Sequence, residues 1–400
     1  MGADVERSWN LPYRCAAIAV DAGTLVRGAV EVNAEVLIVG GGLAGSAAAI
    51  WLARAGRDVV VIEREGQAHH KVCGEFLSRE ALHYLKLLGL DVVSFGAVPI
   101  RAVRLAGNSG FSEAKLPFVA QSLTRRRLDE ELLQMAANAG ARVMRGCRVS
   151  GLEREGAQWR ASVESSEAVC ATAAFLATGK HDLGGRPRPK GKQSDLVAFK
   201  MYWRLAPAQA AALAGHVELM LYRGGYAGLQ AVEDGAANLS CLVQQKELQR
   251  LGGRWENLLA AVQSQCGLLR ERLASAEALL GKPLAVAAIP YGYVRAASDG
   301  VWALGDQAAV IPSFTGDGMS IALHSGCVAA EMYLRGDTAE QFQPKLRGEL
   351  SSQVALATMV SRGLVWGPSR NVFTAAVRLW PDVLGVVARG TRISDGAMLG

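Results

Sequence analysis

The 400-residue sequence has few features that could hold a metal ion, a disulfide framework or a nucleic acid. Its seven cysteines include no Cys-x-x-Cys pair, which predicts a reducing cytoplasm and no metal site. No run of Lys and Arg interleaved with aromatic residues occurs, so no nucleic-acid partner is expected. No stretch reaches the ~18 uncharged apolar residues of a membrane span, and the first thirty residues lack a signal-peptide core. We therefore expect a cytoplasmic protein, with its oligomeric state left open.

The composition indicates a large folded chain. Half of the residues are hydrophobic and only 20% are charged, which excludes global disorder. Four hundred residues exceed what one hydrophobic core usually organises, so at least two lobes are expected. The net charge of +6 could attract an anionic cofactor or lipid, but selects neither by itself.

A strand–turn–helix–strand unit begins near Ala34. Residues 35–39 form a short aliphatic run typical of a buried parallel strand. Residues 46–55 have strong helix propensity, and residues 58–63 form a second apolar run that ends in an acid. This order predicts a right-handed βαβ unit.

The turn inside this unit carries the spacing Gly40-x-Gly42-x-x-Gly45. Glycines at these positions permit a tight turn, approach of a pyrophosphate to the backbone and close packing of the helix on the strand. Glu63 lies near the position of an acid that binds a ribose, and its charge would repel a 2′-phosphate. The unit therefore predicts an FAD or NAD site rather than an NADP site. The residues expected around the nucleotide are Gly40, Gly42, Leu43, Ala44, Gly45, Glu63 and Arg64.

Three later segments favour FAD over NAD. Arg125 opens a helix and offers a cation near the phosphates, although a solvated basic helix start would look the same. The strand ends at Ala177-Thr178-Gly179 and at Gly305-Asp306 could contact the ribityl chain. A glycine turn after Pro312 could direct a helix dipole at the flavin. The additional cofactor-binding candidates are Arg125, Ala177, Thr178, Gly179, Gly305, Asp306, Pro312, Gly316, Gly318 and Met319.

This order of motifs resembles the FAD-dependent monooxygenases of the p-hydroxybenzoate hydroxylase fold, in their geranylgeranyl reductase-like branch. Lys71-Val72-Cys73-Gly74 is similar to the Lys-x-Cys-Gly segment of that branch, which lies beside the flavin. The resemblance implies an α/β fold in which a doubly wound FAD-binding domain is interleaved with a β-sheet substrate domain. It also implies non-covalent FAD, with NAD(P)H as a possible electron donor. Two family features are missing: the Asp-Gly pair soon after Gly179, and the Trp-x-Trp-x-Ile signature of flavin halogenases.

The expected domains alternate along the chain. From Ser194 onward, strand-like segments include a hairpin over 226–232 and 237–243, and helices are expected over 255–265 and 268–280. The division is an N-terminal extension (1–33), FAD-binding segments (34–95, 121–193 and 296–335), substrate-domain segments (96–120 and 194–295) and a helical C-terminal region (336–400).

Candidate catalytic and substrate residues are less sharply defined. Cys73 could line the pocket or supply a proton, or it could be a small buried hydrophobe; Lys71 could contact phosphate or flavin, or lie in solvent. The substrate wall is expected from strand residues that could equally be core: Met201, Trp203, Leu221 and Tyr226. Their apolar character favours a small apolar substrate.

Residues 361–390 combine aromatic residues with arginines. They could form an amphipathic lid that weakly touches a membrane surface, or a helical cap over the core.

The sequence favours a monooxygenase that hydroxylates an apolar aromatic or polyketide-like molecule through a flavin C4a-hydroperoxide. An FAD-dependent reductase of isoprenoid-type double bonds is the alternative. An electron-relay flavoprotein without a small-molecule pocket is the alternative of another class. No catalytic set in the sequence separates hydroxylation from reduction.

Overall fold

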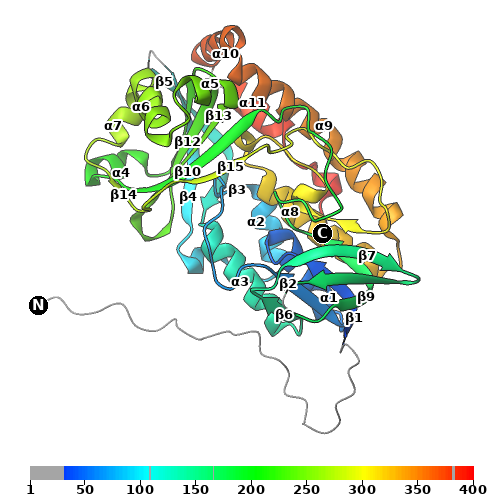
Figure 1. The fold of residues 1–400 in the computed structure, drawn as a ribbon. Helices are drawn as coiled ribbons and strands as arrows, with labels where there is room; N and C mark the ends of the chain where they lie inside the picture. Colours follow the sequence, from blue (N-terminus) through cyan, green and yellow to red (C-terminus); the bar gives the residue numbers. More distant parts are fainter. Residues whose placement is uncertain (1–30, 108–109, 165, 381–382) are drawn as a thin grey trace, which may run out of the picture.

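The computed structural model describes residues 31–107, 110–164, 166–380 and 383–400. Most of the expected N-terminal extension therefore lies outside the described residues, and the first strand begins at Val32. The described strands form two sheets, which Figure 1 shows at opposite ends of the molecule.

The first sheet has the strand order β6-β2-β1-β9-β8-β7, with β16 paired to β9. Its centre is parallel, because β1 pairs in parallel with both β2 and β9. The helices α1 and α8 pack together against this sheet, as expected for a nucleotide-binding α/β unit. The strands are β1 (Val32–Val39), β2 (Val59–Glu63), β6 (Arg142–Arg145), β7 (Val149–Glu155), β8 (Gln158–Val163), β9 (Val169–Leu176) and β16 (Trp302–Ala303).

The second sheet has the order β14-β10-β13-β12-β11-β4-β5-β3, with β15 paired to β10. One face packs on the helices α4 to α7, and the opposite face meets the ends of α9 and α10. The strands are β3 (Phe76–Leu77), β4 (Val98–Gly107), β5 (Gly110–Ser122), β10 (Leu196–Arg204), β11 (His216–Tyr222), β12 (Gly225–Ala231), β13 (Ala237–Gln244), β14 (Glu277–Ala278) and β15 (Leu284–Ala287).

The helices connect and cover these sheets. In Figure 1 the long helix α9 runs along one side of the molecule and leads to α10 and α11, which adjoin the β4–β5 side of the second sheet. They are α1 (Leu43–Arg54), α2 (Arg79–Leu87), α3 (Arg125–Asn138), α4 (Pro207–Leu213), α5 (Gln245–Arg250), α6 (Trp255–Gln265), α7 (Gly267–Arg272), α8 (Gly318–Leu334), α9 (Ala339–Val365), α10 (Gly367–Leu379) and α11 (Val383–Gly390).

The expected elements of the second half are confirmed with one correction. The hairpin forms as β12 and β13, and α6 spans residues 255–265 as expected. The helix expected over 268–280 is wrong in its second half, since α7 ends at Arg272 and β14 follows. Ser275 has φ +60°, which a right-handed helix does not accommodate, and Glu277 then pairs with Arg204 of β10.

The close packing of α1 on α8 depends on a glycine. A Cβ added to Gly326 of α8 would lie 2.4 Å from the carbonyl oxygen of Ala44 in α1 and 3.1 Å from the Cβ of Ala47. The two helices could not keep their present separation with a larger residue there, because buried backbone cannot shift without cost.

We expect Gly326→Ala to lower the free energy of unfolding by about 1–3 kcal/mol, as overpacking does. Gly348→Ala in α9 is the matched control, because nothing lies within 4 Å of its added Cβ. This control should raise the free energy of unfolding by up to ~1 kcal/mol through helix propensity. Chemical denaturation measures both, and equal effects would contradict the packing argument.

Candidate functional site

A cavity of about 750 Å³ lies where residues of the two sheets meet. One part is lined by the β1–α1 turn, the strand ends after β9 and β16, and the turn before α8. Another part is lined by apolar side chains of the second sheet, including Val103, Leu105, Leu219 and Leu221. The cavity therefore joins a polar, glycine-rich compartment to an apolar one.

The β1–α1 turn has the geometry of a phosphate cradle. Gly40 has φ +108°, and a Cβ there would lie 2.4 Å from the carbonyl oxygen of Ala177. A Cβ at Gly45 would lie 1.9 Å from the Gly40 carbonyl oxygen, so the helix can follow the strand this closely only with glycine there. Gly42 is the N-cap of α1 and supplies no side-chain cap, which leaves N–H groups of the first turn for a ligand.

Glu63 is held in place at the carboxyl end of β2. Its Oε2 accepts a hydrogen bond from the Gly41 N–H at 2.8 Å, and its Oε1 accepts one from the Glu65 N–H at 3.0 Å. The side chain lines the cavity beside the turn, the position expected of an acid that binds a ribose.

Two cations lie beside the glycine turn. From the Cβ position of Gly42, the Nζ of Lys71 is 3.6 Å away and the Nη2 of Arg125 is 3.7 Å away. Both pair with Asp129: Arg125 binds it through Nε at 2.7 Å and Nη2 at 2.8 Å, and Lys71 through Nζ at 2.7 Å. Burial raises the pKa of Asp129, but the charges of Arg125 and Lys71 outweigh burial and lower it to about 2. Two cations sharing one carboxylate leave a net positive charge next to Gly42, which suits a diphosphate.

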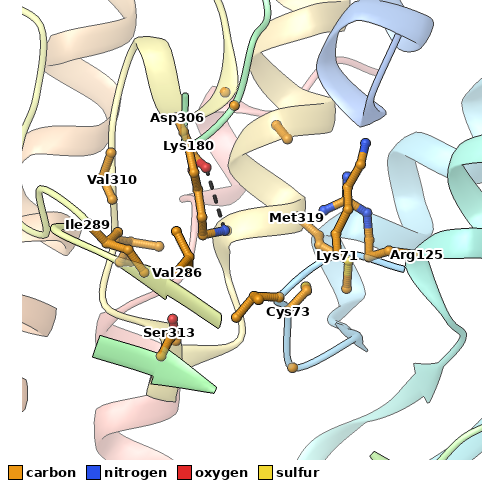
Figure 2. A pocket seen from close by; sticks show the side chains of 18 of the residues that line it. Lys71, Cys73, Arg125, Lys180, Val286, Ile289, Asp306, Val310, Ser313 and Met319 are labelled. Carbon is orange, nitrogen blue, oxygen red and sulfur yellow. Dashed lines mark ion pairs between the residues drawn. The ribbon is translucent and has the colours of Figure 1, made fainter. Parts of the chain in front are cut away.

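The two strand ends opposite this turn are connected to each other. Lys180, just after Gly179, places its Nζ 3.7 Å from the Oδ2 of Asp306, as Figure 2 shows. Gln307 donates from Nε2 to the Gly179 carbonyl oxygen at 2.9 Å. Burial and the nearby charges of Arg64 and Lys180 lower the pKa of His181.

The turn before α8 contains a buried carboxylate. Asp317 is fully buried and ion-paired with Arg392, which also donates to the Thr315 carbonyl oxygen at 3.3 Å. Burial raises the pKa of Asp317 to about 7, with the charge of Glu80 adding to the rise and Arg392 opposing it. Gly318 begins α8 without a side-chain cap and lines the cavity, so this helix also opens its N-terminus to the cavity.

The loop over residues 71–75 is fixed by a buried polar network. Glu75 has φ +63° and is fully buried, and its Oε1 lies 2.5 Å from the Nζ of Lys200, which is also fully buried. Tyr202 donates its hydroxyl to the same oxygen at 2.7 Å, and Asn238 donates to Oε2 at 3.0 Å. Burial raises the pKa of Glu75 and lowers the pKa of Lys200, and each charge opposes the shift of the other.

The same network holds Cys73 at the cavity. Asn238 donates to the carbonyl oxygens of Cys73 and Gly74, both at 3.0 Å, and Lys200 donates to that of Lys71 at 3.1 Å. Figure 2 shows Lys71 and Arg125 side by side, with Cys73 between them and Lys180.

The cavity brings together most of the residues selected from the sequence. Gly45 and Pro312 do not line it but shape the turns beside it. The remaining cofactor and catalytic candidates all line it: Gly40, Gly42, Leu43, Ala44, Glu63, Arg64, Lys71, Cys73, Arg125, Ala177, Thr178, Gly179, Gly305, Asp306, Gly316, Gly318 and Met319.

The expected substrate wall needs a correction. Leu221 and Tyr226 line the cavity, but Met201 and Trp203 do not. Successive residues of a strand point to opposite faces, and in β10 these two pack on the helix-covered face with Leu258. The cavity wall instead includes residues that periodicity did not indicate, among them Val286, Ile289, Val310 and Ser313 (Figure 2). Lys180 was also missed as a cavity residue, although its position after the Ala-Thr-Gly strand end was a signal.

The site fits FAD. The glycine turn leaves no room for a side chain at Gly40 or Gly45, and two cations lie beside it. A second uncapped helix N-terminus opens on the same cavity from the α8 turn. A long dinucleotide with a diphosphate near one turn and a flavin ring toward the other suits this arrangement. The fold and the site thus define a flavoprotein of the two-sheet α/β class.

Comparison with known proteins agrees with this class. Residues 33–173 match the FAD binding domain family. The menaquinone reductase of Mycobacterium tuberculosis (strain H37Rv) is 28% identical over 78% of this chain and 79% of its own length. Digeranylgeranylglycerophospholipid reductase 2 of Methanopyrus kandleri is 27% identical over 77% of this chain and 80% of its own. The solved structure of the flavin-dependent brominase Bmp2 has a TM-score of 0.74 at 17% identity, over 90% of this chain and 93% of that one.

Residues 33–173 thus form an FAD-binding domain, and the whole chain has the fold of the flavin-dependent brominase. The protein is an FAD-dependent oxidoreductase.

Arg125→Met should weaken FAD binding by at least tenfold, because a charge-assisted hydrogen bond to an anion contributes about 1.5–3 kcal/mol. Arg126→Met is the control, since Arg126 is exposed on the same helix and does not line the cavity. Titration of the apoprotein with FAD, followed by flavin fluorescence, measures both affinities. Equal affinity in the two variants would exclude Arg125 from the cofactor site.

The raised pKa of Asp317 predicts a pH dependence of stability. The folded state binds this proton more tightly than the unfolded state, so its contribution is complete below about pH 4 and is lost as pH rises through about 7. Asp317→Asn removes this contribution. We therefore compare the two free energies of unfolding by subtracting the wild-type value from the variant value. This difference should increase between pH 4 and 7. Loss of the Arg392 ion pair should add only a constant offset to it.

Denaturation curves at several pH values, with FAD in fixed excess, test this. Asp395→Asn is the control, because Asp395 is exposed and pairs with Arg79 in the same C-terminal segment. A flat difference for Asp317→Asn would show that Asp317 does not titrate in this range.

Proposed function

We propose that this enzyme is an FAD-dependent reductase that saturates a carbon–carbon double bond in an isoprenoid-type lipid. Support comes from the relatives whose names describe a menaquinone reductase and a digeranylgeranylglycerophospholipid reductase. These similarities favour reduction over the hydroxylation that the sequence put first.

The apolar compartment of the cavity supports the proposed class of substrate. Within the described residues, the acidic side chains that line the cavity are Glu63, Glu75, Glu164, Asp182 and Asp306. All five come from the FAD-binding sheet and its loops or from the 71–75 loop, and none from strands β4, β10, β11, β12 or β15. A compartment walled by aliphatic and aromatic side chains suits a hydrocarbon chain rather than a sugar or an acid.

The two compartments suggest which part of the reaction the cofactor performs and which part the chain's own residues perform. Reduced FAD supplies a hydride when bound. The chain's own residues exclude water with the apolar wall and hold protons at the boundary, where Cys73 and Lys180 both line the cavity. The Cys73 Sγ accepts the Glu75 N–H at 3.3 Å, which leaves the thiol proton free to point elsewhere. We propose that one of these two groups completes the addition to the double bond.

The other candidate reactions have less support. Hydroxylation needs the same dry pocket, so the cavity itself does not oppose it. Halogenation has a fold-level similarity to the brominase, but the chain lacks the Trp-x-Trp-x-Ile signature. A pure electron relay needs no substrate pocket, whereas this cavity has a large apolar compartment.

The proposal predicts that a polyprenyl compound will reoxidise the reduced protein without oxygen. The holoenzyme is reduced photochemically under argon and mixed in a stopped-flow instrument with geranylgeraniol, and flavin absorbance is followed. Reoxidation should be at least tenfold faster than in buffer, with the saturated alcohol as product by mass spectrometry. Reoxidation only with oxygen, accompanied by hydroxylation of a phenol, would support the monooxygenase instead.

The variant Gly228→Leu tests whether the substrate binds in the apolar compartment. Gly228 lines the cavity, and its added Cβ would meet only the Leu219 side chain, at 3.7 Å, so the variant should fold. A leucine there should slow polyprenyl-dependent reoxidation at least tenfold while FAD stays bound. Gly151→Leu in β7 is the control, because nothing lies within 4 Å of its added Cβ and it does not line the cavity.

A further inference from the structure

Exposed apolar side chains are concentrated in one part of the described chain. Among the described residues, the large hydrophobic side chains with high exposure outside this part are Val93, Phe111 and Val119. The others lie between residues 359 and 386, and we refer to them as the C-terminal apolar surface: Met359, Trp366, Val372, Leu379, Trp380 and Val386. Leu379 is 87% exposed and Trp380 is 67% exposed. Such a concentration of exposed apolar groups usually marks an interaction surface.

The same helices form a wall of the apolar compartment on their inner side. Leu364 of α9, Phe373 of α10, and Val387 and Ala388 of α11 line the cavity. The C-terminal apolar surface is therefore separated from the cavity by the thickness of one helix layer. Figure 1 shows α10 at the top of the molecule, with α11 below it.

The charge of this segment is mostly positive. Residues 359–389 contain four arginines, Arg362, Arg370, Arg378 and Arg389, and one acid, Asp382. Arg362 and Arg389 are exposed in the structure. Exposed apolar groups in a segment with an excess of basic residues match an anionic lipid surface, where each Lys or Arg contributes about 1 kcal/mol of attraction.

We infer that α10, α11 and the adjoining end of α9 are the surface by which this protein rests on an anionic lipid bilayer. No helix in the described ranges has the length and hydropathy needed to span a bilayer, so the contact is with the membrane surface. This inference goes beyond the proposed reaction. It gives an isoprenoid substrate a short path from the bilayer, past α10 and α11, into the apolar compartment.

A flotation assay with the full-length holoenzyme tests the surface. The vesicles are phosphatidylcholine alone or phosphatidylcholine with 30% phosphatidylglycerol, at 0.1 M and 0.5 M NaCl. The test variant replaces Leu379, Trp380 and Val386 by serine, and the matched control replaces Val93, Phe111 and Val119 by serine. All six side chains are exposed, so both triple variants should fold.

The wild type and the control should float with the anionic vesicles at 0.1 M NaCl. The test variant should bind at least tenfold more weakly, and 0.5 M NaCl should reduce wild-type binding, since salt screens surface charges. Wild type that does not float, or equal loss in both variants, would overturn the inference. So would a wild-type dimer in light scattering that the test variant dissociates, because a second copy would then cover this surface.

One measurement separates this inference from the proposed reaction. Reduction of a detergent-solubilised polyprenyl substrate by the test variant should stay within about twofold of the wild type, because the substituted side chains do not line the cavity. If neither protein reduces the substrate while flotation behaves as expected, the proposed reaction fails and the membrane surface stands. A test variant that loses activity in detergent would show that these residues act on the pocket rather than on the membrane.

Discussion

The fully buried ion pair of Glu75 and Lys200 is the interaction on which the geometry of the site depends. It connects the loop that carries Lys71 and Cys73 to strand β10 of the second sheet, with Tyr202 and Asn238 satisfying the remaining carboxylate positions. Two buried charges cost several kcal/mol to desolvate, and such a pair specifies one arrangement more than it adds stability. Here that arrangement sets the polar compartment at a fixed place beside the apolar one.

The features that the sequence predicted well depend on neighbouring residues. The strand, the glycine turn and the helix from Val36 to Arg54 are contiguous, so spacing alone identifies the cradle. The start of the helix α3 at Arg125 is also a local feature, because a few adjacent residues decide where a helix begins. The family resemblance, rather than the spacing, identified the loop around Cys73 as part of the site.

The features that could not be predicted depend on tertiary placement. The face of β10 that looks toward the site is decided by register, and a shift of one residue exchanges Met201 and Trp203 for Lys200 and Tyr202. The sequence, through its resemblance to FAD-dependent monooxygenases, also put hydroxylation before reduction, since flavin chemistry leaves no motif that separates the two reactions. The exposure of Leu379 and Trp380 likewise depends on where α10 packs, which the amphipathic pattern left open.

The ion pair between Arg392 and Asp317 joins positions that are 75 residues apart in the chain. During synthesis on the ribosome, the buried carboxylate of Asp317 must therefore wait for its partner long after α8 has been made. Until then the turn before α8 lacks its counter-ion. The Arg392 side chain that packs over Phe76 and Phe118 is not yet in place either. The pocket for the prosthetic group is accordingly complete only once residue 392 of the nascent polypeptide is in place.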